Sequence, residues 1–328
     1  MEYKYLGKTG VKVSTLCFGT MSFGGDADEK ESAKMFRRCR DLGINFFDCA
    51  NVYANGLSEE ILGRFIADCR DEVLITSKVY GPTGPGENER GSSRRNIVLA
   101  VEKSLKRLNT DRLDLYFFHG FDQNTSIEDS LKAMDDLVRQ GKILYPAVSN
   151  WAAWQIAKAL GISSRDGFAR FECVQPMYNL VKRQVESEIL PLCQSEQLGV
   201  IPYSPLGGGL LTGKYSDKQK VSKGRLLENE MYGHRYAEAN YHNVVECYMD
   251  YCRRKNINPV TLAVAWVRAH PAVTAPIIGA RSLEQLEPSL NALEIKMDPS
   301  WWLEISALSP RPPIATDRRE EFEESPFD

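Results

Sequence analysis

An acid, a phenol, an amine and an imidazole come at the ends of three successive apolar segments of this sequence. They are Asp48 and Tyr53 after residues 44–47, Lys78 after 72–77, and His119 after 113–118. Each segment has the length and bulk of a buried strand. Because parallel α/β proteins carry out chemistry at the carboxyl ends of their strands, the four side chains should meet on one face. The alternatives are a strand-end turn covered by a packed tyrosine, and a histidine buried in the core.

These residue types together suit proton transfer to a carbonyl oxygen. A phenol has a reference pKa of about 10, so Tyr53 alone exchanges protons poorly at neutral pH. The Lys78 ammonium would lower the pKa of Tyr53, and Asp48 would pair with Lys78. His119 would donate a hydrogen bond that orients the carbonyl. No side chain is a hydride donor, so the site implies a reduced nicotinamide or flavin.

The four side chains resemble the catalytic tetrad of the aldo-keto reductases. Other segments resemble that family in the same order: 47–48 with 58–59, then 141–143 leading to 148–150, then 279–282 with 284–286. The resemblance extends from about residue 3 to about residue 293. It implies a single (β/α)8 TIM barrel without a Rossmann domain, and an enzyme that reduces an aldehyde or ketone to an alcohol.

The elements that must position these groups form a repeating pattern. Residues 3–14 alternate around a glycine-bounded turn and predict a β-hairpin, which the resemblance places across the barrel floor. Strand-like and helix-like segments then alternate without a long linker, which favours one closed barrel at about 15–295 within a single domain, 1–328. A doubly wound sheet is the main alternative, but no G-x-G-x-x-G motif is present.

Two further segments carry structural expectations. Pro146 stands inside a predicted strand, where it lacks a donor, so we expect a bulge or a broken bond. Residues from about 296 to 328 form a predicted C-terminal tail, with Trp301 and Trp302 docked on the side of the barrel. Its charged end, 318–324, is expected to be solvated and weakly ordered.

The resemblance implies a set of nicotinamide contacts. Tyr203 would stack on the nicotinamide ring, while Ser149, Asn150 and Gln175 would hold its carboxamide. Backbone near Gly19 would pass close to the cofactor. The other expected contacts are Thr20, Met21, Asp48, Ser204, Pro205, Gly207, Leu211, Ile278, Gly279, Ala280, Gln285 and Ser289.

The pyrophosphate is expected beside the loop that follows Tyr203. Leu206, Lys214 and Arg225 would lie along it, because backbone N–H groups and cations suit phosphate. Residues 208–215 also nearly match a P-loop, G-x-x-x-x-G-K, but Tyr215 replaces the Ser or Thr that would bind Mg²⁺. A nucleoside triphosphatase is therefore a weak alternative.

Arg281 indicates which dinucleotide is used. By resemblance it lies at the adenosine ribose, where a guanidinium can bind a 2′-phosphate through charge-assisted hydrogen bonds. We therefore expect NADPH, or NADP in the reverse direction, to be preferred over NADH by roughly tenfold or more. Pro288 and Ser289 replace polar residues common in relatives, so the adenine should be held loosely. The alternative is a surface arginine near a helix N-terminus.

The substrate pocket should be built from the loops that follow the strand ends. Besides Tyr53 and His119, the expected aromatic walls are Phe23, Tyr80, Phe121, Trp151 and Trp154. Such walls suit sugars, aryl aldehydes and flat ketones alike. Gly120 follows His119 where many relatives carry a large residue, so we expect a more open mouth.

Composition excludes several other classes of function. The formal net charge is -3, with no basic cluster, which argues against nucleic-acid binding. No apolar run is long enough to span a membrane, and no secretory signal opens the chain, so a cytoplasmic enzyme is expected. The 8 cysteines and 4 histidines show no metal-ligand spacing. Oligomeric state cannot be predicted from these features.

The family resemblance also supports a second class of function. It extends to potassium-channel β subunits, which keep this tetrad and cofactor site. The alternative to an enzyme is therefore a nicotinamide-sensing regulatory subunit. This chain begins directly at its predicted hairpin, which we take to favour the enzyme.

Overall fold

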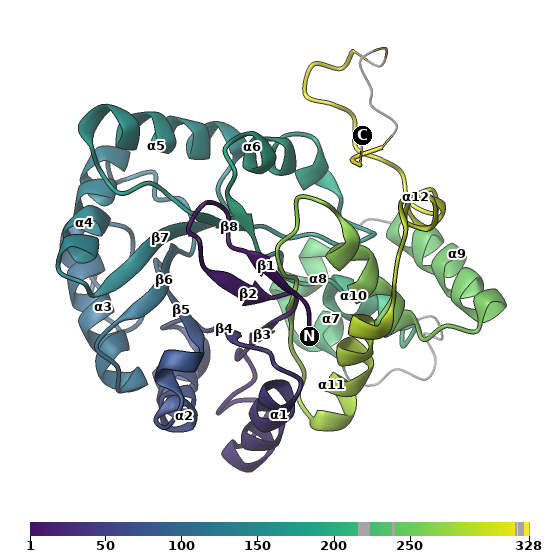
Figure 1. Ribbon diagram of the computed structural model, residues 1–328, viewed down its shortest axis with the longest axis horizontal. Helices are drawn as coiled ribbons and strands as arrows, with labels where there is room; N and C mark the ends of the chain where they lie inside the picture. The colour runs from purple at the N-terminus through teal and green to yellow at the C-terminus, as the bar shows by residue number, and fades with distance from the viewer. Residues whose placement is uncertain (216–223, 238–239, 319, 321–324, 328) are drawn as a thin grey trace.

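The computed structural model describes residues 1–328 except 216–223, 238–239, 319, 321–324 and 328 (Figure 1). In this part, eight parallel strands form one sheet in the order β10-β3-β4-β5-β6-β7-β8-β9. They are β3 (Cys17–Gly19), β4 (Phe46–Asp48), β5 (Leu74–Val79), β6 (Leu113–Phe118), β7 (Ile143–Ser149), β8 (Cys173–Gln175), β9 (Gly199–Val200) and β10 (Ile277–Ile278). Backbone N–H groups of Thr274 and Ile277 donate to Val200 and Pro202 at 2.9 and 2.8 Å, which closes the sheet. The predicted (β/α)8 barrel is confirmed.

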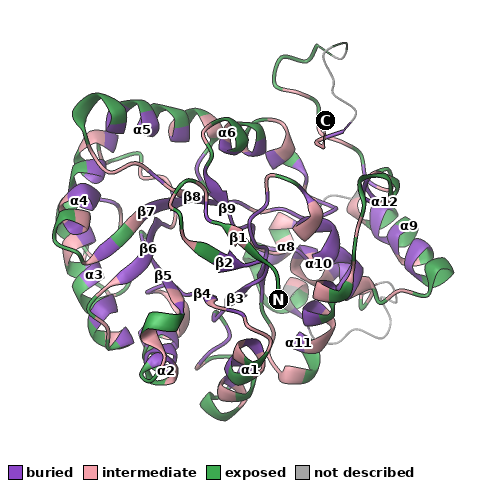
Figure 2. Cartoon of the chain, viewed as in Figure 1, coloured by how far each residue is buried: buried purple, intermediate pink, exposed green. Residues whose placement is uncertain are grey.

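Helices surround the strands with their apolar faces turned inward (Figures 1 and 2). They are α1 (Glu29–Asp41), α2 (Leu57–Ile66), α3 (Arg94–Leu108), α4 (Ile127–Arg139), α5 (Ala153–Asp166), α6 (Ile189–Ser195), α7 (Arg225–Glu228), α8 (Glu230–Arg235), α9 (Asn240–Lys255), α10 (Pro259–Ala269), α11 (Leu283–Leu290) and α12 (Pro299–Ser306). Asp28, Ser93 and Ser126 cap α1, α3 and α4 by accepting a backbone N–H of the first turn. Short 3₁₀ helices that matter for the site are η1 (Tyr53–Gly56), η3 (Gln184–Glu186) and η4 (Gly207–Thr212).

The N-terminal hairpin closes one end of the barrel. Strands β1 (Tyr3–Tyr5) and β2 (Lys12–Ser14) pair antiparallel. The neighbouring side chains of Leu6 and Val13 are fully buried and pack with the residues that fill the barrel interior, among them Phe46 and Phe117. Gly199 permits this approach, because a Cβ there would lie 2.5 Å from Cδ1 of Leu6. The hairpin therefore seals the end opposite to the strand ends that carry the polar groups.

The predicted bulge at Pro146 is wrong. Pairing of β7 with β6 keeps one register through Tyr145, Pro146 and Ala147. The carbonyl of Pro146 accepts from the Glu172 backbone N–H at 3.0 Å, so its backbone polar groups face the β8 side. Because β8 begins only at Cys173, the ladder has no strand bond for the missing N–H to break.

The tryptophan pair of the tail docks as predicted. Trp302 stacks on Trp266 of α10 with ring centroids 5.3 Å apart, and its indole N–H donates to the Trp266 carbonyl. Trp301 donates to the hydroxyl of Tyr251 on α9. The charged segment 318–324 lies largely outside the described residues, and the expectation of weak order there stays a prediction.

Candidate active site

Three neighbouring strands bring the predicted tetrad to one end of the barrel. Asp48 is the last residue of β4 and pairs in register with Thr76 of β5. Lys78 lies two residues further along β5, and His119 directly follows β6. Parallel strands in register end at the same edge, so the three side chains converge there. Tyr53 reaches the same place from η1.

A buried ion pair forms the centre of the site. Lys78 Nζ donates to both carboxylate oxygens of Asp48 and to the Cys49 carbonyl, each at 2.7 Å. Thr76 Oγ1 and Gln175 Nε2 also donate to Oδ1 of Asp48, at 2.7 and 2.8 Å. The side chains of Lys78 and Asp48 are 0% and 3% exposed. Both charges are thus compensated by a full set of partners, which a buried pair needs to be tolerated.

Tyr53 lies on a turn with an unusual backbone. The φ angles of Ala54 and Asn55 are 46° and 54°, and Gly56 follows with 95°. The left-handed region costs a non-glycine residue about 1–2 kcal/mol, so contacts around the turn must hold it. The Tyr53 ring centroid lies 5.2 Å from Lys78 Nζ and 6.2 Å from that of His119.

The pKa of Tyr53 is shifted in the direction opposite to the prediction. Burial, followed by the nearby Asp48 carboxylate, raises the pKa of the Tyr53 phenol well above its usual value. The donors of the Lys78 ammonium are directed at Asp48 and Cys49. In this arrangement Tyr53 is a neutral phenol that retains its proton.

His119 is also neutral near pH 7. Burial, with a smaller contribution from the Lys78 ammonium, lowers the pKa of the His119 imidazole to about 3. A neutral imidazole keeps one N–H, which can donate a hydrogen bond without carrying a charge. The site thus presents two neutral donors, Tyr53 and His119, beside a buried cation that is already paired.

The predicted carboxamide contacts lie together next to the tetrad. Asn150, in the left-handed region with φ 61°, donates from Nδ2 to the His119 carbonyl and to Ser149 Oγ. Its Oδ1 accepts from the Tyr203 hydroxyl at 2.7 Å. Gln175 is engaged with Asp48, as described above. This cluster of amide and hydroxyl groups beside an aromatic ring has the chemistry that a nicotinamide carboxamide requires.

The loop after Tyr203, which is predicted to lie along the pyrophosphate, contains several residues in the left-handed region. Ser204 has φ 57°, and Gly207, Gly208 and Gly209 have φ 59°, 66° and 99°. Consecutive residues of this kind can direct backbone N–H groups toward a phosphate. Lys214 lies close by, because a Cβ on Gly209 would be 2.9 Å from Cε of Lys214.

Other members of the predicted phosphate site are placed less clearly. Leu206 immediately precedes η4, Leu211 lies within it, and Pro205 is buried. Arg225 begins α7, but its side chain lies outside the described part of the chain. In the part of the chain that the structure describes, β9 ends at Val200 and no strand directly precedes η4, so the near match to a P-loop lacks the strand that a P-loop follows.

Arg281 is paired with two carboxylates in this structure. Its Nε lies 3.0 Å from Asp26, and its guanidinium lies 3.7 Å from Glu228 of α7. Gln285 accepts from the Arg281 backbone N–H. Ser289 is 2% exposed in α11, so it is not presented at the surface with Arg281.

The ends of β3 and β10 complete the predicted cofactor set. Gly19 pairs in register with Asp48, and the Thr20 hydroxyl donates to the Asp48 carbonyl. A Cβ on Gly279 would lie 3.3 Å from the Gly19 carbonyl, so these two loops are in contact. The other predicted contacts here are Met21, which is exposed, Ile278, which is the last residue of β10, and Ala280, which follows this strand.

The Tyr80 side chain lies beside Gly120, where a more open mouth was expected, and that expectation stays a prediction. A Cβ on Gly120 would lie 2.9 Å from Cε1 of Tyr80, so the Tyr80 ring occupies the space that a larger residue would fill. Phe121 packs against Trp151 and Trp154, with centroids 4.9 and 6.2 Å apart. The mouth is therefore partly covered by aromatic rings from three loops.

Two of the predicted aromatic walls are mainly core residues. Phe23 is fully buried and packs on Phe18 and Phe65. Trp151 is 4% exposed and packs on Phe118 and Phe171 between the strands and helices. Sequence alone did not distinguish these rings from exposed ones, because aromatic residues suit both environments.

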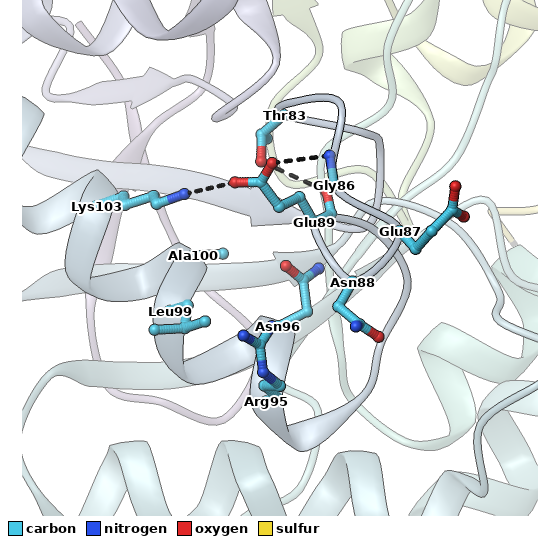
Figure 3. A pocket seen from close by; sticks show the side chains of 10 residues that line it. All are labelled: Thr83, Gly86, Glu87, Asn88, Glu89, Arg95, Asn96, Leu99, Ala100 and Lys103. Atoms are coloured by element: carbon cyan, nitrogen blue, oxygen red, sulfur yellow. Dashed lines mark hydrogen bonds and ion pairs between the residues drawn. The ribbon is translucent and has the colours of Figure 1, made fainter.

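Two cavities are present near this end of the molecule. One, of about 220 Å³, is lined by Asn150, Trp151, Val174, Pro176, Met177, Lys182, Gln184, Val185, Ile189 and Tyr203. The other, of about 250 Å³, lies between the loop after β5 and α3, where Glu89 bridges Lys103 and the Gly86 backbone (Figure 3). Neither lining includes a tetrad residue, but the first includes Asn150 and Tyr203, two of the predicted nicotinamide contacts.

Comparison with known proteins agrees with this architecture. The sequence profile described as "Aldo/keto reductase family" matches residues 15–310. The chain belongs to this family. Its members are oxidoreductases that generally use NAD(P)H.

Relatives of this aldo/keto reductase are named as oxidoreductases, as reductases or as potassium channel subunits. An uncharacterized oxidoreductase, YrpG, of Bacillus subtilis is 38% identical over 91% of this chain and 93% of its own. A probable voltage-gated potassium channel subunit beta of Arabidopsis thaliana is 38% identical over 90% and 92%. A norsolorinic acid reductase of Aspergillus flavus is 31% identical over 92% and 79%.

The sequence missed one residue that the site depends on. Thr76 donates to Asp48 and was not among the expected residues. A signal was available, because Thr76 and Lys78 are two apart in one strand and therefore face the same side.

Within the described residues, no cluster of side chains suits a metal ion, and no helix is long and apolar enough to cross a membrane.

Proposed function

We propose that this aldo/keto reductase reduces an aldehyde or ketone to an alcohol, with NADPH as cofactor and Tyr53 as proton donor. The observation that carries the proposal is the meeting of a neutral Tyr53 and a neutral His119 beside the buried Asp48–Lys78 pair. Bound NADPH would supply the hydride. Ser149, Asn150, Gln175 and Tyr203 would hold its nicotinamide end.

The protein's own residues would perform the proton transfer as follows. His119 donates a hydrogen bond that orients the substrate carbonyl toward Tyr53. Tyr53 then gives its hydroxyl proton to the carbonyl oxygen as negative charge develops there. The resulting phenolate is stabilised by the Lys78 ammonium, which Asp48 keeps in place. Because its pKa is raised, Tyr53 stays protonated until it transfers the proton to the carbonyl oxygen.

The test of this proposal is Tyr53→Phe. The substitution removes the proton and leaves the ring, so cofactor binding, followed by tryptophan fluorescence, should be unchanged. Turnover of a panel of aldehydes, ketones and sugars should fall by at least about 100-fold, since general acid catalysis contributes about 10²–10⁴. Undiminished turnover in the variant would show that another group supplies the proton.

A regulatory subunit is the second candidate, and one observation favours it. The relative from Arabidopsis thaliana is named as a probable voltage-gated potassium channel subunit beta and covers nearly the whole chain. A pull-down that returned a stoichiometric membrane protein, together with negligible aldehyde turnover, would support this candidate over the enzyme.

A further inference from the structure

The left-handed turn that carries Tyr53 contacts the side chain of Arg107 at Gly56. A Cβ on Gly56 would lie 2.9 Å from both Cδ and Nε of Arg107, a residue of the last turn of α3. The absence of a side chain at Gly56 therefore lets the turn sit directly on Arg107. Any larger residue at this position would have to displace one or the other.

Arg107 is held in turn by a buried carboxylate. Its Nε donates to Oε2 of Glu59 at 2.6 Å. Glu59 belongs to the first turn of α2 and is fully buried, whereas the Arg107 side chain is 21% exposed. Separating such a pair leaves an uncompensated charge inside the protein, so the contact is costly to break.

The other oxygen of Glu59 reaches the strand that carries Lys78. Ser77 Oγ donates to Oε1 of Glu59, and Ser77 immediately precedes Lys78 in β5. A continuous chain of contacts therefore runs from Gly56 through Arg107 and Glu59 to Ser77. These contacts link the turn that carries Tyr53 to β5, the strand that carries Lys78.

We propose that Arg107 and Glu59 are positioning residues that fix Tyr53 relative to Lys78. This inference rests on the proposed function, in which Tyr53 is the proton donor. Among the described residues, their side chains form hydrogen bonds with each other and with Ser77, none of which is a predicted substrate or cofactor contact. Because a displacement of about 1 Å can cost about 100-fold in rate, the pair should act on the chemical step and leave cofactor affinity unchanged.

The experiment replaces both residues together. Arg107→Met alone would leave Glu59 charged and unpaired, whereas the double variant Glu59→Gln/Arg107→Met removes both charges. The glutamine can still accept from Ser77. We expect the single-turnover rate of NADPH oxidation to fall about 10- to 100-fold. KM and the NADPH Kd should stay within about twofold, and Arg107→Lys should recover part of the rate.

A matched control is provided by the ion pair Arg70–Asp114. Its atoms are 2.8 Å apart, and the side chains are 13% and 12% exposed. It lies at the opposite, amino end of β5 and β6, where residues of this fold serve stability. Arg70→Met/Asp114→Asn should therefore lower stability but keep the single-turnover rate within about twofold.

Two results would overturn the inference. One is an unchanged single-turnover rate in both the double variant and Gly56→Ala. The methyl group of Gly56→Ala would clash with Arg107 and displace the turn. The other is an equal loss of rate in the Arg70 control. If the double variant does not fold, the single-turnover rates of Gly56→Ala and Arg107→Lys test the inference instead. An active Tyr53→Phe would refute the proposed function instead, so the two failures are distinguishable.

Discussion

Removing the charge of Asp48 should destabilise the protein measurably. In Asp48→Asn the shape of the side chain is kept, but Lys78 is left as a fully buried ammonium without a counter-charge. The amide oxygen and the Cys49 carbonyl could still accept from Lys78, but neither carries a charge. The amide NH2 group would also face a donor, either from Lys78 or from Thr76 and Gln175. Breaking a buried pair in this way costs about 3–5 kcal/mol.

This cost converts into an observable shift of Tm. An unfolding entropy of about 2.1 cal/mol/K per residue gives about 0.7 kcal/mol/K for a chain of 328 residues. The loss should therefore lower Tm by about 4–7 °C at pH 7. Differential scanning calorimetry, supported by urea unfolding, measures both quantities.

Two variants sharpen the Asp48 test. Asp48→Asn/Lys78→Met removes the unpaired cation, so it should recover most of the stability. Asp114→Asn breaks a pair that is more exposed, at 12–13%, and should cost less. If the free energy of unfolding of Asp48→Asn lay within about 1 kcal/mol of the parent's, breaking the buried pair would cost less than predicted.

The other predictions concern the cofactor and pH. Arg281→Ala should weaken NADPH binding about tenfold or more without changing the Kd of NADH, and equal effects on both would refute a contact to the 2′-phosphate. Asp26→Asn removes one competing carboxylate from Arg281, so NADPH should bind about 1.5- to 5-fold more tightly. Burial lowers the pKa of His270 to about 4, and its Nδ1 accepts a backbone N–H. The unfolded state therefore binds more protons between about pH 4 and 6.5, so stability should fall as pH falls through this window. The shift corresponds to about 3 kcal/mol, and His270→Asn should flatten urea unfolding free energies over that range.

The positions of the tetrad on the fold were accessible from the sequence alone. Asp48, Lys78 and His119 each end an apolar segment, and a parallel sheet places all such ends at one edge. The hairpin also follows from a local pattern, whereas its place at the barrel floor was implied by the family resemblance. These inferences succeed because the direction of a strand and the face of a side chain depend on nearest neighbours in the chain.

Other features depended on residues that come together only when the barrel closes. Gln175 bonds to Asp48 across 127 positions of sequence. Tyr80 fills the space beside Gly120. The direction of the Tyr53 pKa shift is of the same kind, because it depends on burial and on the nearby Asp48 carboxylate.

The register at Pro146 shows the same division between local and tertiary information. A proline in a strand predicts a lost bond, but whether a bond exists to be lost depends on where the neighbouring strand begins. The Arg107–Glu59 contact beneath Gly56 is likewise set by how α3 packs against α2. The sequence thus determined which groups could do chemistry, while packing determined their charges, partners and supports.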